Sequence, residues 1–148
     1  MAWYDGATVR FYDCVDEVLL KFAVIIARSE GNWVFCKQKG RDTYELPGGH
    51  REEGETILEA AERELHEETG ALTYSMKPVC VYSITAPGNF GGEESFGMLY
   101  YAEIREFEPE LHSEIERILI TDKPVENWSY PPIHPKMIEE GRRRGFIE

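Results

Sequence analysis

Apolar and β-branched residues are grouped in short runs along the chain, and this pattern predicts a β-sheet. The longest run, VLLKFAVIIA over residues 18–27, indicates a buried strand. Residues 29–32 are typical of a hairpin turn, so residues 33–37 are expected to form the returning strand. Further strands are predicted at residues 44–46, 77–85, 96–104 and 116–121.

Two segments show the pattern of a helix. Thr56 and Glu59 have the spacing of a capping box, so a helix is expected to begin there, and Gly70 suits its end. A last helix is predicted over residues 135–143, while the glycine-rich residues 86–94 are expected to form a mobile loop. Strands on either side of a central helix favour an α/β fold with a mixed sheet and helices on both faces.

The central helix carries an apolar stripe at helical spacing, which predicts its buried face. The stripe consists of Leu58, Ala61 and Leu65. Glu64 and Glu68 lie at the margin of this stripe, and Glu67 lies further round. Position alone leaves two interpretations open: a functional cluster of carboxylates, or ordinary helix-forming residues on an acid-rich surface.

The three glutamates also suit metal chemistry, because they stand at i, i+3 and i+4 of one helix. Hard divalent cations prefer such oxygen ligands, and phosphate chemistry commonly depends on these cations. Three carboxylates this close would raise one another's pKa unless a cation compensated their charge.

The surrounding motif resolves the two interpretations. From Gly49 the chain reads G-x5-E-x7-R-E-L-x-E-E-x-G-A. This pattern resembles the Nudix box, G-x5-E-x7-R-E-U-x-E-E-x-G-U, where U is a bulky aliphatic residue. The matching residues are Gly49, Glu55, Arg63, Glu64, Leu65, Glu67, Glu68 and Gly70. Ala71 is smaller than usual for the last position, which affects the packing behind the helix.

The resemblance implies a Nudix-type α/β/α sandwich that hydrolyses a nucleoside diphosphate linked to another group, with Mg²⁺ or Mn²⁺. By analogy, Glu64, Glu67, Glu68 and the carbonyl of Gly48 hold the cations, and one glutamate takes a proton from the attacking water. Arg63 is expected to hold a box carboxylate, either Glu55 or Glu64, in place.

The family often uses one more acid from outside the box. Glu114 is the first choice here, because an acid just before the last long strand is common among Nudix proteins. The alternatives are Glu93, Glu94 and Glu116.

Substrate selection lies outside the motif, and four residues are taken as candidates. Arg28 is placed to meet phosphates, while Tyr44 and Phe90 offer rings for stacking on a nucleobase. MutT-type members read the base through an asparagine near the last helix, and Asn127 is the asparagine nearest that place. Asn127 lies early in the chain relative to the last helix, and this position disfavours specificity for oxidised guanine.

Length and charge limit the remaining choices. The 148 residues are enough for one domain, residues 1–148, and the formal net charge of −12 disfavours nucleic-acid and membrane partners. Three widely spaced cysteines and a start without a secretory signal favour the cytoplasm.

The predicted substrate is a small nucleotide, and the first choice is a nucleoside triphosphate cleaved to monophosphate and pyrophosphate. The protein is expected to be a monomer or a homodimer. Three other substrates stay open: ADP-ribose, a dinucleotide or a sugar nucleotide. A nucleotide-sensing Nudix module without turnover is a further alternative.

Overall fold

The computed structural model describes residues 2–88, 90–109 and 115–148. A single sheet of seven strands runs through the molecule in the order β1-β5-β6-β2-β3-β7, with β4 paired to β2. Strands β2 and β6 are parallel, and the other pairs of neighbours are antiparallel. The strands are β1 (Thr8–Tyr12), β2 (Leu20–Ser29), β3 (Asn32–Gln38), β4 (Gly48–His50), β5 (Ala71–Thr85), β6 (Ser95–Phe107) and β7 (Ile115–Thr121).

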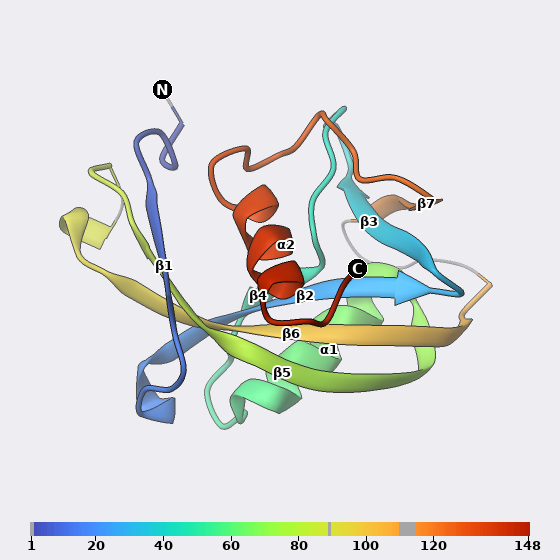
Figure 1. Cartoon of the computed structure of the whole chain (residues 1–148), viewed down its shortest axis with the longest axis horizontal. Coiled ribbons are helices and arrows are strands. Elements are labelled where there is room, and N and C mark those ends of the chain that lie inside the picture. Colours follow the sequence, from blue (N-terminus) through green and yellow to red (C-terminus); the bar gives the residue numbers. More distant parts are fainter. Residues whose placement is uncertain (1, 89, 110–114) are drawn as a thin grey trace.

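Two α-helices cover the sheet, and they lie on opposite sides of it (Figure 1). Helix α1 spans Ile57–Thr69 and helix α2 spans His134–Arg143. Two short 3-10 turns, η1 (Glu17–Leu19) and η2 (Phe90–Gly92), precede β2 and β6. Within the described ranges, no helix is both long and apolar enough to cross a membrane. The mixed sheet with helices on both faces agrees with the prediction.

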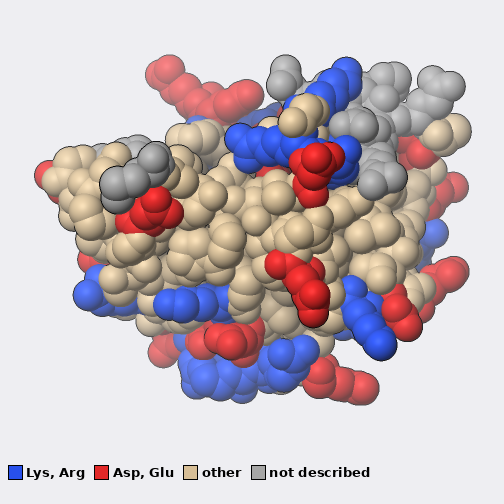
Figure 2. Space-filling view, turned by 90° about the horizontal axis from the view of Figure 1, so that it is seen from above, with Lys and Arg blue, Asp and Glu red and all other residues tan. Residues whose placement is uncertain are grey.

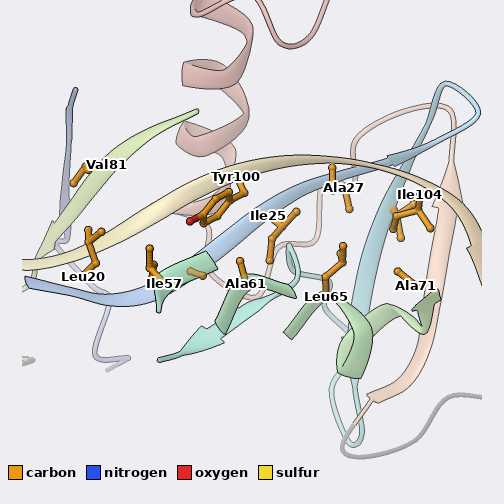
Figure 3. Packing of buried hydrophobic residues seen from close by; sticks show 13 residues of the cluster. Leu20, Ile25, Ala27, Ile57, Ala61, Leu65, Ala71, Val81, Tyr100 and Ile104 are labelled. Atoms are coloured by element: carbon orange, nitrogen blue, oxygen red, sulfur yellow. The ribbon is translucent and has the colours of Figure 1, made fainter. Parts of the chain in front are cut away.

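Alternating residues of β2 divide the core into two layers, as expected when successive side chains of a strand point to opposite faces. Ile25 and Ala27 face α1, where they belong to one cluster with Ile57, Ala61 and Leu65 (Figure 3). Because each large buried side chain contributes roughly 1.5–3 kcal/mol, this layer fixes α1 firmly on the sheet.

The second layer lies on the face that carries α2. Val24 and Ile26 of β2 form a cluster there with Phe35, Met137 and Ile138. The central strand is therefore buried on both faces, which explains why its sequence is almost continuously apolar.

Several sequence predictions need correction. Strand β1 was not predicted, because its five residues are at most half-buried and give little apolar pattern. Strand β5 begins at Ala71, well before residue 77, because its first half also pairs with β6. Within residues 44–46, Tyr44 and Glu45 form isolated bridges, and there is no full strand. Leu58 is 43% exposed, since the buried face of α1 is centred on Ala61.

Candidate active site

Helix α1 has well-defined ends, which fix the direction of its acidic side chains. The Thr56 hydroxyl accepts a hydrogen bond from the Glu59 backbone N–H, and the Glu59 carboxylate accepts one from the Thr56 N–H. Gly70 adopts a left-handed conformation, with φ of 77°, that ends the helix. Both ends are as predicted.

Arg63 connects the loop before α1 to the acidic face of the helix. Its guanidinium donates two hydrogen bonds to the Glu55 carboxylate, at 2.7 and 3.0 Å, and one to the carbonyl oxygen of His50. It also donates to Glu64 at 2.6 Å and to Glu67 at 3.4 Å. The Arg63 hydrogen bonds lower the pKa of Glu55 to about 2, so this carboxylate is ionised at neutral pH.

Two glycines bring strand β4 against the same carboxylates. The Gly48 backbone N–H donates a 2.6 Å hydrogen bond to Oε1 of Glu68. A Cβ atom at Gly49 would lie 2.5 Å from the carboxyl carbon of Glu64, so only glycine leaves this carboxylate in place. The two glycines therefore allow the backbone of β4 to pack closely against the carboxylates of Glu64 and Glu68.

The acidic side chains show unequal electrostatics. Burial raises the pKa of Glu64, and it raises the pKa of Glu68 well above its usual value. Burial thus disfavours the charged form of both carboxylates, and a bound cation would stabilise that form. All the donors here are oxygens, the type that Mg²⁺ and Mn²⁺ prefer, so the residues present fit such an ion.

The carboxylates are engaged by the protein itself as they stand. Arg63 binds Glu64 and Glu67, and Gly48 binds Glu68. In the part of the chain that the structure describes, no three acidic, histidine or cysteine side chains are grouped as a ready metal shell.

A cavity of about 500 Å³ is lined in part by Gly48 and Gly49 of strand β4. Its walls are largely apolar and aromatic, with a few polar groups between them. The lining includes Trp3, Phe22, Glu45, Gly48, Gly49, His50, Tyr82, Ser95, Tyr130 and His134. A cavity of this size and character is typical of a small-molecule site, and its rim lies beside the acidic face of α1.

Of the candidate substrate residues whose side chains the structure describes, Arg28, Tyr44 and Asn127 are not in the lining of this cavity. Arg28 lies over the ring of Trp33, 4.4 Å from its centroid, and lines a different cavity. Tyr44 is buried in the core on the α2 side. The Asn127 amide donates to the carbonyl of Asp42. The side chain of Phe90 lies outside the described residues.

The candidate acids outside the motif have different surroundings. Glu114 lies outside the described residues, as does the side chain of Glu116. Glu94 accepts hydrogen bonds from the Tyr12 and Ser83 hydroxyls, which lower its pKa and tie the loop before β6 to strand β1.

Sequence reasoning missed several residues of the cavity. His134 and Tyr130 come from the C-terminal segment, and Glu45 precedes strand β4. Burial raises the pKa of Glu45, whose Oε1 accepts a hydrogen bond from Gln38. In the sequence, the only signal of these residues is a single polar side chain beside apolar neighbours. Such a pattern does not identify a binding site by itself.

Comparisons with known proteins agree with the geometry. A family model described as NUDIX domain matches residues 19–139. Over 140 residues the chain is 29% identical to YtkD of Bacillus subtilis, provisionally named an 8-oxo-dGTP diphosphatase, with 86% of this chain and 84% of YtkD covered. A 47-residue segment is 43% identical to the RNA pyrophosphohydrolase of a Psychrobacter species, covering 32% of this chain and 27% of that protein.

A solved structure extends the likeness to the whole chain. A mutant of the Bacillus subtilis pyrophosphohydrolase BsRppH superimposes with a TM-score of 0.79 at 25% identity, covering 100% of this chain and 98% of that one. The predicted Nudix α/β/α sandwich is thereby confirmed. The chain belongs to the Nudix family, and it is a Nudix hydrolase of the pyrophosphohydrolase type.

Proposed function

We propose that residues 1–148 form one Nudix domain that hydrolyses a nucleoside 5′-triphosphate to the monophosphate and pyrophosphate, with Mg²⁺ or Mn²⁺. One contact carries this proposal, the hydrogen bond from Gly48 to Glu68. This bond joins the acidic face of α1 to Gly48, which lines the cavity. A substrate can therefore place its phosphates at the acidic face while its nucleoside lies in the cavity.

The box residues are assigned as follows. Glu64, Glu67 and Glu68, with the carbonyl oxygen of Gly48, hold the cation, which supplies electrostatic stabilisation and an activated water when bound. Glu64 or Glu67 accepts the proton of the attacking water. Arg63 positions Glu64, because the same guanidinium is fixed by Glu55.

The acid outside the motif is still assigned to Glu114. In sequence Glu114 directly precedes strand β7, and an acid just before the last long strand is common among Nudix proteins. The contact of α1 with β7 supports this choice.

RNA with a 5′-triphosphate end is a second candidate substrate. Two observations favour it: the 47-residue likeness to an RNA pyrophosphohydrolase, and the charge distribution in Figure 2. On the face shown there, basic and acidic side chains are interspersed over a largely uncharged surface, and acidic side chains also lie near its middle. The net charge of −12 is thus not concentrated on this face, which weakens the charge argument against nucleic acid.

A substrate panel tests both candidates. The protein is incubated with Mg²⁺ and, separately, nucleoside triphosphates, ADP-ribose, a dinucleotide, a sugar nucleotide and a 5′-triphosphorylated oligoribonucleotide. Anion-exchange chromatography identifies the products. The proposal expects a monophosphate and pyrophosphate from a free triphosphate.

Three other results would change the assignment. Turnover of the oligoribonucleotide with little turnover of free nucleotides would favour RNA. Preferred cleavage of ADP-ribose or a sugar nucleotide would overturn the triphosphate proposal. Nucleotide binding without any cleavage, measured by calorimetry, would indicate a sensing module.

A further inference from the structure

His134 combines two properties that the catalytic assignment does not use. It stands at the first position of α2, and its side chain lines the cavity although only 6% of the residue is exposed. Its Nδ1 atom accepts a 3.1 Å hydrogen bond from the backbone N–H of Leu46. Leu46 lies two positions before Gly48, so the imidazole is anchored directly to the segment that leads into strand β4.

This hydrogen bond determines where the imidazole carries its proton. Nδ1 must offer a lone pair to the N–H of Leu46, so the proton resides on Nε2. Burial lowers the pKa of His134 to about 3, and the ring is therefore neutral at physiological pH. With Nδ1 engaged, the ring offers any ligand a hydrogen-bond donor at Nε2 and no acceptor.

Neighbouring rings fix the direction of this donor. Trp128 and Tyr130 both meet the imidazole edge-on, with centroids 6.3 and 5.2 Å away. Within the described part of the chain, Nε2 makes no hydrogen bond to protein, and Nδ1 uses the only such bond of the side chain. Nε2 is not among the fully buried side-chain atoms that lack a partner, so this donor is accessible from the cavity that His134 lines. A donor of fixed direction that opens into the cavity favours a ligand acceptor there.

The other walls of the cavity suit a planar ring system. Phe22, Tyr82 and Tyr130 contribute aromatic surface, and Ile84 adds apolar surface. The rim is formed by Gly48 and Gly49, next to the proposed phosphate and metal site. A nucleobase is the planar part of the proposed substrate, so its edge is the partner available to His134.

We propose that His134 selects the base by donating its Nε2–H to a ring carbonyl oxygen, which favours 6-oxopurine nucleotides over adenine nucleotides. This inference rests on the proposed function. In the same pose, adenine presents its 6-amino group, a second donor. Two donors would then face each other in a buried site, and neither would be satisfied.

The first test is a kinetic comparison of ITP and ATP, which differ at the purine 6-position and its adjoining ring nitrogen. The expected kcat/KM is about 10- to 100-fold lower for ATP, the range that an unsatisfied buried donor produces. The difference should appear mainly in KM, because the base is remote from the reacting phosphorus. GTP should behave like ITP.

Two variants separate base selection from a purely structural role. His134→Phe keeps a ring but removes both hydrogen bonds, so the preference for ITP should disappear. His66→Gln is the matched control, because His66 is half-exposed on α1, beside Glu108 and outside the cavity. That variant should keep the full preference. Equal kcat/KM for ITP and ATP in the wild type, or an unchanged preference in His134→Phe, would overturn the inference.

A measurement without turnover keeps the test independent of the proposed function and of folding of the variant. Long-range ¹H–¹⁵N NMR of the wild-type protein, without divalent metal, reports which imidazole nitrogen is protonated. Protonated Nε2, with a shift of its signal on addition of ITP and none with ATP, supports the inference. Protonated Nδ1, or equal shifts with both nucleotides, overturns it. If no triphosphate is hydrolysed, the proposed function fails and this titration alone decides the inference.

Discussion

Arg63 and Glu64 are neighbours in sequence, yet the Nη1 atom of Arg63 lies 2.6 Å from Oε1 of Glu64. Adjacent side chains on a helix normally diverge, so this contact requires the long arginine side chain to turn back along the helix. Glu55 and the carbonyl of His50 hold it in that position. The loop before α1 therefore positions a carboxylate on α1 through a single guanidinium.

Replacing Arg63 tests this arrangement. Arg63→Lys keeps the charge but cannot reach Glu55 and Glu64 with a planar fork. The expected result is a loss of about 10- to 100-fold in kcat, the range typical of residues that orient metal ligands. Steady-state kinetics with Mg²⁺ measure this change.

Glu55→Gln provides the matching control for Arg63. It weakens the bidentate partner of the guanidinium without touching Glu64, so its effect should have the same direction and a smaller size. Wild-type turnover in Arg63→Lys would show that Glu64 needs no such support.

The two glycines of β4 should respond differently to alanine. In Gly49→Ala the new Cβ meets the flexible carboxylate of Glu64, which can move, so the fold should persist while Mn²⁺ affinity falls. In Gly48→Ala the new Cβ meets the backbone oxygen of Ala23, which cannot move easily. That variant should lose about 1–3 kcal/mol of stability. Thermal melting and Mn²⁺ titration of both variants separate these effects, and the opposite pattern would contradict the packing described here.

The neutral state of His134 predicts a specific pH dependence of stability. The pKa of His134 is about 3 in the folded protein, against an ordinary value of 6.5, so the unfolded chain binds more protons between these limits. Stability due to this group is complete above pH 6.5 and is lost as the pH falls, at a slope approaching about 1.4 kcal/mol per unit.

Urea unfolding of the wild type and His134→Gln between about pH 4 and pH 7 tests this dependence. The glutamine variant lacks the titrating ring, so the difference in unfolding free energy should shrink as the pH decreases. A difference that stays constant with pH would mean that the ring is not buried in its neutral form.

The sequence was sufficient for the elements whose signals are local. Helix α1 was predictable at both ends, because Thr56, Glu59 and Gly70 each act within one helical turn. The central strand was predictable because burial on both faces makes β2 almost wholly apolar. The contact of Arg63 with Glu55 and Glu64 also follows from short separations along the chain.

The cavity could not be predicted in the same way, because its lining depends on tertiary packing. Phe22 meets Tyr130 and His134 there from a segment far away in sequence, and none of the three carries a local mark of its position. Strand β1 was missed for a related reason. Its pairing with β5 makes it a strand, and its own residue pattern does not indicate one. Leu58 shows the reverse error. Its apolar side chain was expected on the buried face of α1, but it is exposed to solvent.

The central claim is that the acidic face of α1 binds a divalent cation for anhydride hydrolysis, and Glu68→Gln tests it most directly. Mn²⁺ binding by electron paramagnetic resonance and triphosphate turnover are measured on this variant, on the wild type and on Glu62→Gln, which removes an exposed charge from the same helix. We expect Glu68→Gln to bind Mn²⁺ more weakly and to lose at least about 100-fold in kcat with its fold intact, while Glu62→Gln behaves as the wild type. Wild-type binding and turnover in Glu68→Gln would contradict the account.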